Sequence, residues 1–228
     1  MYLSRVRLDV RSAAVRRDLA DLNAMHRTVM TSVPDGLGLA PRAQAGVLWR
    51  LDLPGTGRSP VLLVQSATSP DWSHLPSGYS IDPTTDVRSL DPVLAALRIG
   101  ARFRFRLRAN PTRKVDTKSS PNGERRNGRR IPLRGDEACL AWLVRQAAGA
   151  GFGIGSTPQD AARAVIVRPQ GDALGRRDAG TAPPVTVRSV LFEGVLTVHD
   201  PERLGHALAA GIGPGRAYGC GLLSLAPA

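Results

Sequence analysis

Residues 98–134 read RIGARFRFRLRANPTRKVDTKSSPNGERRNGRRIPLR, and the first part of this stretch has the clearest structural pattern in the chain. Apolar side chains at 103, 105 and 107 alternate with arginines. Successive side chains of a β-strand point to opposite faces of a sheet. The pattern therefore predicts a strand over 101–109, with one face in a hydrophobic core. The opposite face carries Arg102, Arg104, Arg106 and Arg108.

The same stretch holds nearly all of the net charge of the chain. It contains thirteen lysines and arginines against two acids, a net of +11, whereas the whole chain carries +12. Charge concentrated in this way is typical of a surface that binds a polyanion, and arginine forks match phosphate oxygens. The strand arginines would repel one another unless an anion lay over them. The alternative interpretation is a charged strand face that is exposed to solvent.

Bulk properties limit the class of protein. A chain of 228 residues fits one large domain or two small ones. Cys139 and Cys220 are far apart and form no CxxC motif, so we expect no disulfide, metal or cofactor, and a reducing cytoplasm. The amino terminus is charged from Arg5 onward, unlike a signal peptide, and no apolar run approaches the roughly 18 residues of a membrane span. We therefore expect no association with membranes.

Periodicity predicts the order of secondary structure in each half of the chain. In the first half we expect a strand over 2–10, a helix over 12–30 that is capped by Ser12, and a hairpin of strands over 44–51 and 59–66. An irregular segment over 67–92 follows, with a short strand between 79 and 87. The second half begins with the strand over 101–109, a mobile basic insertion over 111–130 and a helix over 136–148. Two strands over 163–169 and 185–198 then flank a basic hairpin tip, followed by a helix over 201–210 and a last strand over 222–225.

Each half thus has the order β-α-β-β-α-β, although the second helix of the first half is weak. That order is the ferredoxin-like unit, which is also the topology of the RNA-recognition motif. The predicted fold class is α+β, with two tandem ferredoxin-like (RRM-like) domains over 1–92 and 99–228. Strand aromatics are too few for an RNA-recognition signature, so bound RNA would be held by electrostatics and shape.

The segment 211–221, GIGPGRAYGCG, is rich in glycine and lies between a predicted helix and a predicted strand. Such a loop can present backbone N–H groups to a phosphate. It can equally be a tight structural connection, because glycine adopts positive φ and allows close approach of another backbone. It matches neither a Rossmann fingerprint nor a P-loop. Both interpretations stay open from the sequence.

Several motifs together resemble the CasE family, the CRISPR-associated endoribonucleases of type I-E systems. The resemblance spans the chain and rests on six motifs. They are MYLSRV at 1–6, LNAMHR at 22–27, SPDWSHLP at 69–76, FRLRANPT at 105–112, FEGVLTVHDP at 192–201 and GIGPGRAYGCGLLSLAP at 211–227.

The resemblance implies an activity and partners. Family members cut a CRISPR repeat RNA stem-loop without a metal, leaving a 5′-hydroxyl and a 2′,3′-cyclic phosphate. They then retain the product among the other subunits of a type I-E surveillance complex, so we expect a monomer when free. We expect the RNA to contact the strand arginines, the basic insertion, the hairpin and the glycine-rich loop. Beyond the four strand arginines, these residues are Arg125, Arg126, Arg129, Arg130, Arg168, Arg176, Arg177, Gly213, Gly215, Arg216 and Gly219.

His26 matches the catalytic histidine of the family in its position on the first helix. A histidine can act as acid or base because its pKa lies near the operating pH. The alternative is a helix-border histidine that lies partly on the apolar stripe. Well-known relatives carry tyrosine at the position of Asn23, which cannot exchange a proton near pH 7 but can donate a hydrogen bond. Arg27 either stabilises charge on the phosphate or faces solvent.

Three hypotheses follow from these features. The first is a repeat-RNA endonuclease that stays bound to its product. The second, favoured by Asn23, is a non-catalytic RNA-binding subunit of the same complex. The third is a basic RNA chaperone without sequence preference, for which affinity would depend on salt but not on the hairpin.

Overall fold

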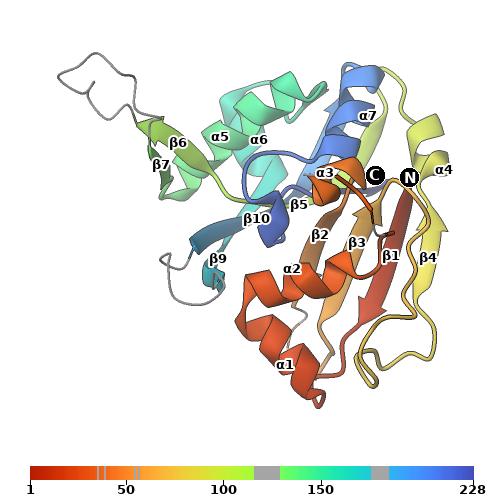
Figure 1. Cartoon of the computed structure of the whole chain (residues 1–228). Coiled ribbons are helices and arrows are strands. Elements are labelled where there is room, and N and C mark those ends of the chain that lie inside the picture. The colour runs from red at the N-terminus through yellow and green to blue at the C-terminus, as the bar shows by residue number, and fades with distance from the viewer. Residues whose placement is uncertain (35, 39, 54, 56, 116–128, 176–184) are drawn as a thin grey trace, which may run out of the picture.

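A computed structural model describes residues 1–34, 36–38, 40–53, 55, 57–115, 129–175 and 185–228. Figure 1 shows a mixed α/β molecule with two antiparallel sheets, one built from each half of the chain, and a small two-stranded ribbon that projects from the second half. Each sheet has its own cluster of buried apolar side chains. The prediction of a fold that mixes helices and strands is therefore confirmed.

The first sheet has the strand order β2-β3-β1-β4, and every pair is antiparallel. Its strands are β1 (Tyr2–Arg7), β2 (Leu48–Asp52), β3 (Val61–Ser66) and β4 (Asp86–Ser89). Helices α1 (Ala13–Ala20) and α2 (Leu22–Met30) cover one face (Figure 1). They bury Val15, Met25 and Val29 against the apolar side chains of the strands. The short helix α3 (Pro41–Gln44) leads into β2.

The single helix predicted over 12–30 is wrong, because Asp21 divides it into α1 and α2. The backbone of Asp21 is extended, with φ −143° and ψ 113°, and its carboxylate accepts a hydrogen bond from the backbone N–H of Asn23. An aspartate in this conformation is a strong N-cap. Ser12 precedes α1 but makes no side-chain capping bond. Asp21 thus starts α2 and sets the direction of the helix that carries His26.

A buried carboxylate ties the two helices together. Asp18 of α1 is 1% exposed and accepts hydrogen bonds from Thr28 Oγ1 at 2.6 Å and from the Tyr79 hydroxyl at 2.8 Å. Arg17 donates to its second oxygen at 2.8 Å. A buried charge is tolerated when its hydrogen bonds are satisfied in this way. The cluster holds α2 in place from the side opposite its exposed face.

The second sheet has the strand order β11-β5-β10-β8, with β9 also paired to β10. Its strands are β5 (Arg102–Ala109), β8 (Phe152–Gly153), β9 (Val165–Gly175), β10 (Val185–Val198) and β11 (Leu223–Pro227). The predicted strand over 101–109 is confirmed as β5, whose residues Phe103, Phe105 and Leu107 are buried. Helices α5 (Asp136–Gly149) and α7 (Pro201–Ala210) agree with the predicted helices over 136–148 and 201–210.

Other parts differ from expectation. The ends of the predicted mobile insertion form a paired ribbon of β6 (Thr112–Val115) and β7 (Arg129–Pro132), whereas 116–128 lie outside the described residues. Strand β8 and helix α6 (Pro158–Ala164) were not predicted. Residues 67–85 are irregular, as expected, but the short strand expected between 79 and 87 lies at β4, and the unpredicted helix α4 (Asp91–Ala95) follows it. These short elements lack a full period of apolar residues, so their packing rather than their pattern determines them.

The two halves are joined through a buried arginine. Arg50 of β2 is 2% exposed and forms a bidentate pair with Asp52, at 2.7 and 3.1 Å. Its remaining donor, Nη1, reaches the second half at the carbonyl of Arg106 (3.1 Å) and at Ser224 Oγ (2.9 Å). Gln65 of β3 adds a bond to the carbonyl of Leu208 at 2.7 Å. These hydrogen bonds between buried groups hold the second half against strands β2 and β3 of the first sheet.

Candidate functional site

Helix α2 has a side that is turned away from the core of the first sheet, and residues from the second half of the chain pack against this side. Helix α2 packs against β9 and against the short 3₁₀ turn η1 (Arg216–Tyr218) of the glycine-rich loop. His26 lies on this side of the helix and is half-buried, whereas Arg27 is exposed. The structure therefore brings together two segments that the sequence analysis had considered separately, the first helix and the loop.

His26 is neutral near pH 7. Burial, together with the positive charge of Arg42, lowers its pKa to about 4. Its Nδ1 atom is buried and has no hydrogen-bond partner among the described residues. A neutral imidazole can accept a proton, which is what a general base must do.

Asn23 lies one helical turn before His26, next to the end of β9. A Cβ atom placed on Gly175 would lie 3.5 Å from Asn23 Nδ2 and 3.2 Å from Tyr218 Cε1. Both side chains therefore lie around the space that a Cβ on Gly175 would fill. An alanine there would press on the ring of Tyr218 and would only touch Asn23. Tyr218 was not predicted as a site residue.

A cavity of about 760 Å³ opens beside η1, and we call it the arginine pocket. It lies between the β6–β7 ribbon, helix α5 and the glycine-rich loop. Among the residues that the structure describes, no carboxylate lines it. Its lining consists of Arg42, Thr112, Arg113, Arg130, Trp142, Arg145, Gln146, Gly213, Pro214, Gly215, Arg216, Ala217 and Tyr218.

The positive charges of this pocket affect one another and His26. The pKa of Arg42 is lowered by burial and by the nearby charge of Arg216, and Arg42 in turn lowers the pKa of His26. Like charges held this close are unfavourable unless an anion joins them. The pocket therefore has the electrostatics of a site for an anion, and one of its arginines, Arg42, is close enough to act on the neutral imidazole of His26.

The glycine-rich loop is a tight structural connection, one of the two interpretations that the sequence left open. Gly213 has φ 79°, and a Cβ there would lie 2.8 Å from the ring of Trp142. Gly219 has φ 74°, and its Cβ would lie 2.7 Å from the ring of Trp49. Two tryptophans thus contact the loop backbone where only glycine fits. Gly213, Gly215 and Arg216 also line the arginine pocket, whereas Gly219 packs on Trp49 outside it.

The arginine face of β5 is only partly available to a ligand. Arg102 and Arg104 are exposed, and Arg104 donates to the carbonyl of Pro227. Arg106 pairs with Glu193, and it donates to Asp52 Oδ2 at 3.3 Å. The expectation that an external anion must neutralise this whole face is therefore wrong for Arg106, because the chain supplies the carboxylates.

Arg108 also points into the interface between the halves. It donates to the carbonyl of Leu51 at 3.2 Å and to Gln170 Oε1 at 3.1 Å, and burial lowers its pKa. Arg168 of β9 is exposed and pairs with Glu193 at 3.0 Å. The remaining predicted contacts on the insertion and hairpin tip lie outside the described residues. These are Arg125, Arg126, Arg176, Arg177 and the side chain of Arg129.

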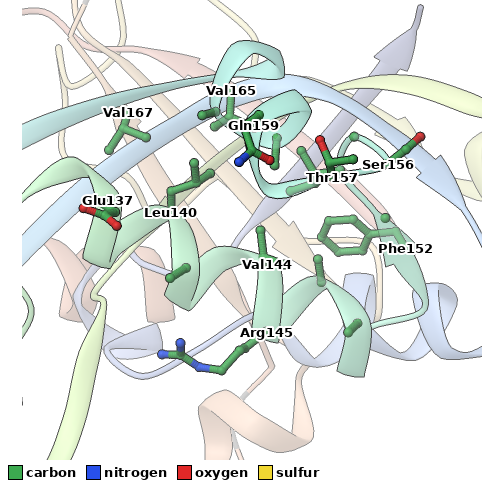
Figure 2. A pocket seen from close by; sticks show the side chains of 18 of the residues that line it. Glu137, Leu140, Val144, Arg145, Phe152, Ser156, Thr157, Gln159, Val165 and Val167 are labelled. Carbon is green, nitrogen blue, oxygen red and sulfur yellow. The ribbon is translucent and has the colours of Figure 1, made fainter.

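A second cavity of about 930 Å³ lies between α5, α6 and β9, away from His26. Figure 2 shows Leu140, Val144, Phe152 and Val165 around it, while the side chain of Arg145 extends away from them. Arg145 lines the arginine pocket as well. The larger cavity is thus mainly apolar and lacks the clustered positive charge of the arginine pocket.

Two further findings concern the described residues as a whole. No group of three or more His, Cys, Asp and Glu side chains that could hold a metal ion occurs among them. Over the same ranges, no helix is long and apolar enough to cross a membrane.

Comparison with known proteins gives a consistent result. Residues 1–227 match the family model described as CRISPR associated protein. The chain is 37% identical over 236 residues to the CRISPR-associated endoribonuclease Cse3 of Thermus thermophilus, with 100% of both chains covered. It is 30% identical over 229 residues to the CRISPR system Cascade subunit CasE of Escherichia coli, again with 100% of both covered.

Similarity extends to a solved structure. The CRISPR endoribonuclease Cse3 bound to 19 nt RNA superposes with a TM-score of 0.76 at 36% identity, and each chain is covered over 100% of its length. Among the described residues, five arginines line one cavity, and this gives the cavity the electrostatics of a site for an anion. The chain belongs to the CRISPR-associated protein family, and the resemblance to the CasE family is confirmed.

Sequence reasoning missed several residues of the site. Arg42, Arg113, Arg145 and Tyr218 line the arginine pocket but come from four different elements or loops. No local pattern distinguishes them from ordinary surface residues. The one available signal was the position of Tyr218 inside the glycine-rich segment, where it is the single aromatic residue.

Proposed function

We propose that this protein is an endoribonuclease that cuts CRISPR repeat RNA stem-loops into guide RNAs. The observation that carries the proposal is the environment of His26, which is half-buried and has its pKa lowered by Arg42, one of five described arginines that line the arginine pocket. The relatives named as CRISPR endoribonucleases, one of them with RNA bound, support the same substrate.

The reaction we propose needs no metal. The 2′-hydroxyl of the nucleotide before the cut attacks the adjacent phosphorus while His26, as general base, takes its proton. The bond from phosphorus to the 5′ oxygen breaks, that oxygen takes a proton from solvent, and His26 afterwards releases to solvent the proton that it removed. The products are a 2′,3′-cyclic phosphate and a 5′-hydroxyl, so protons and charge balance and no water is consumed. Asn23 donates a hydrogen bond near the reacting nucleotide, and Arg27 contributes positive charge.

RNA binding is proposed to centre on the arginine pocket. Arginine forks and the backbone N–H groups of Gly213 and Gly215 suit phosphate oxygens. The β6–β7 ribbon would extend this surface along the RNA, and the exposed arginines Arg102, Arg104 and Arg168 would add to it. Arg106 and Arg108 are already paired within the chain, so their contribution to RNA binding is expected to be small.

Each half of the chain is proposed to be a ferredoxin-like domain, over 1–92 and 99–228. In sequence order, the strands of the first sheet read 4-1-3-2 from β4 to β2. The main path of the second sheet has the same order when β5, β8, β10 and β11 are numbered one to four. Two separate apolar cores support the division. The first half uses an irregular segment over 67–85 where the second half uses α7.

After cleavage the protein is proposed to keep its product and to join the other subunits of a type I-E surveillance complex. The name of the E. coli relative, a Cascade subunit, supports this assignment. A monomer in the cytoplasm is the expected form before assembly. Gel filtration with and without RNA would test the monomer.

The test of the proposed function is cleavage of a labelled repeat hairpin from the CRISPR locus of the same genome, in EDTA. We expect wild type to cut at one bond and His26→Ala to bind the hairpin without cutting it. Removing a general base typically costs about 10²- to 10⁴-fold in rate. His206→Ala is the matched control, because this exposed histidine on α7 lies outside the site. Tight hairpin binding without any cleavage by wild type would instead assign a non-catalytic RNA-holding subunit.

A further inference from the structure

Tyr218 occupies a position that the proposed reaction has not yet used. It ends η1, is half-buried, and lines the arginine pocket. Among the described residues, none forms a hydrogen bond with its hydroxyl group. A phenol at the rim of a positively charged cavity is therefore available to a bound phosphate.

Tyr218 also lies next to the catalytic side of α2. Its ring and the amide of Asn23 flank the same glycine, at 3.2 and 3.5 Å from the position of a Cβ on Gly175. Asn23 and His26 are three residues apart on one helix, so their side chains share a face. Contacts of α2 with β9 and with η1 thus bring the amide of Asn23 and the ring of Tyr218 to one glycine, on the helix face that also carries His26.

Two arginines of the arginine pocket already donate hydrogen bonds to backbone carbonyls of the chain. Arg42 donates from Nη1 to the carbonyl of Val47 at 3.0 Å. Arg216 donates from Nη2 to the carbonyl of Gly211 at 3.1 Å. A phosphate whose charge rises in the transition state needs donors aimed at its oxygens. The hydroxyl of Tyr218 is such a donor and is not engaged by the described part of the chain.

We propose that Tyr218 is a catalytic residue, whose hydroxyl donates a hydrogen bond to a non-bridging oxygen of the reacting phosphate. The inference rests on the proposed function. The proton stays on Tyr218 throughout, so the step adds no new proton transfer. In this arrangement His26 acts on the ribose while Tyr218 and the arginine pocket hold the phosphate from the other side.

The experiment measures single-turnover cleavage of the repeat hairpin by wild type, Tyr218→Phe and Tyr2→Phe. We expect Tyr218→Phe to cut roughly 10- to 100-fold more slowly, with RNA affinity and melting temperature unchanged, because a hydrogen bond to a charged group is lost. Tyr2→Phe removes a hydroxyl from β1, outside the site, and should cut like wild type.

Phosphorothioate substrates distinguish direct contact from a structural role. Sulfur at the contacted non-bridging position accepts a hydrogen bond poorly, so wild type should discriminate between the two diastereomers at the cut. Tyr218→Phe should lose part of that discrimination. Wild-type rates in Tyr218→Phe would overturn the proposal, and so would slow cleavage with unchanged discrimination. If wild type itself does not cut the hairpin, the proposed function fails and this inference fails with it.

Discussion

At the scale of single residues, the environment of His26 matters more than its identity. An exposed histidine has a pKa near 6.5 and would be partly charged at the pH of a cell. Partial burial and the charge of Arg42 both disfavour the imidazolium form. The side chain is therefore deprotonated near pH 7, as the proposed role of general base requires.

This environment predicts the pH dependence of cleavage. The acidic limb of kcat/KM reports the free enzyme, so it should bend near pH 4 rather than near pH 6.5. Imidazolium cannot take the proton of the 2′-hydroxyl. The rate therefore falls as the pH falls through the pKa of His26. Single-turnover rates at limiting protein, from about pH 3.5 to 8, would measure it. A bend near 6.5 would contradict a buried, neutral His26.

At the scale of elements, the glycine-rich loop connects folding with the site. It passes over Trp49 of the first half and Trp142 of the second, and it presents Arg216 and Tyr218 to the arginine pocket. A loop that contacts two bulky rings through its backbone has little freedom to move. The two tryptophans therefore support the loop residues that we assign to the reaction.

Substitution of a glycine in this loop should be costly. Gly219→Ala places a Cβ 2.7 Å from the ring of Trp49 at a backbone φ of 74°. We expect the free energy of unfolding to drop by about 2 kcal/mol or more, since the left-handed conformation alone costs roughly 1–2 kcal/mol. Urea denaturation would measure the change.

Gly100→Ala is the control for this prediction. Gly100 has a similar φ of 81°, but a Cβ there meets nothing within 4 Å. Its substitution should therefore show the backbone cost without the clash. If the free energy of unfolding fell equally in the two variants, the clash with Trp49 would contribute little to the destabilisation.

At the scale of the whole molecule, the described arginines include two groups with different surroundings. Arg50, Arg106 and Arg108 join the two halves through the carbonyl of Arg106, the carboxylate of Asp52 and the carbonyl of Leu51, respectively. The arginine pocket carries a separate set without a described carboxylate in its lining. Internal pairs stabilise the fold, whereas the second set is available to an external polyanion.

This division predicts how RNA binding responds to salt. The double variant Arg113→Gln/Arg130→Gln removes two charges from the arginine pocket, so the slope of log K against log salt should fall by roughly 1.5. Filter binding between about 50 and 300 mM salt would measure it. The double variant Arg5→Gln/Arg88→Gln is the control, because β1 and β4 lie on the opposite side of the molecule from the β6–β7 ribbon (Figure 1). If the slope fell only in the control variant, the RNA would bind on another face of the protein and the prediction would be wrong.

Much of the fold could be predicted because its elements have strong local patterns. Strand β5 alternates over eight residues, and α5 and α7 have acidic first turns and apolar faces. The break at Asp21 was not predicted, because a continuous apolar stripe runs through it and only the extended backbone of that residue ends α1. The two-residue strand β8 carries no period at all, so its pairing with β10 depends on the sheet around it.

The sequence by itself determined the concentration of charge, the mixed α/β class and the family, and it singled out His26 as the candidate catalytic residue. All of these depend on residue identity and on patterns over a few neighbouring residues. Only the tertiary structure decided which arginines remain available to a ligand. It also brought Tyr218, Arg42 and Arg216 to the helix that carries His26. The reason is physical, because burial, charge pairing and pKa depend on distances between segments far apart in the chain, and these are set when the two halves pack together.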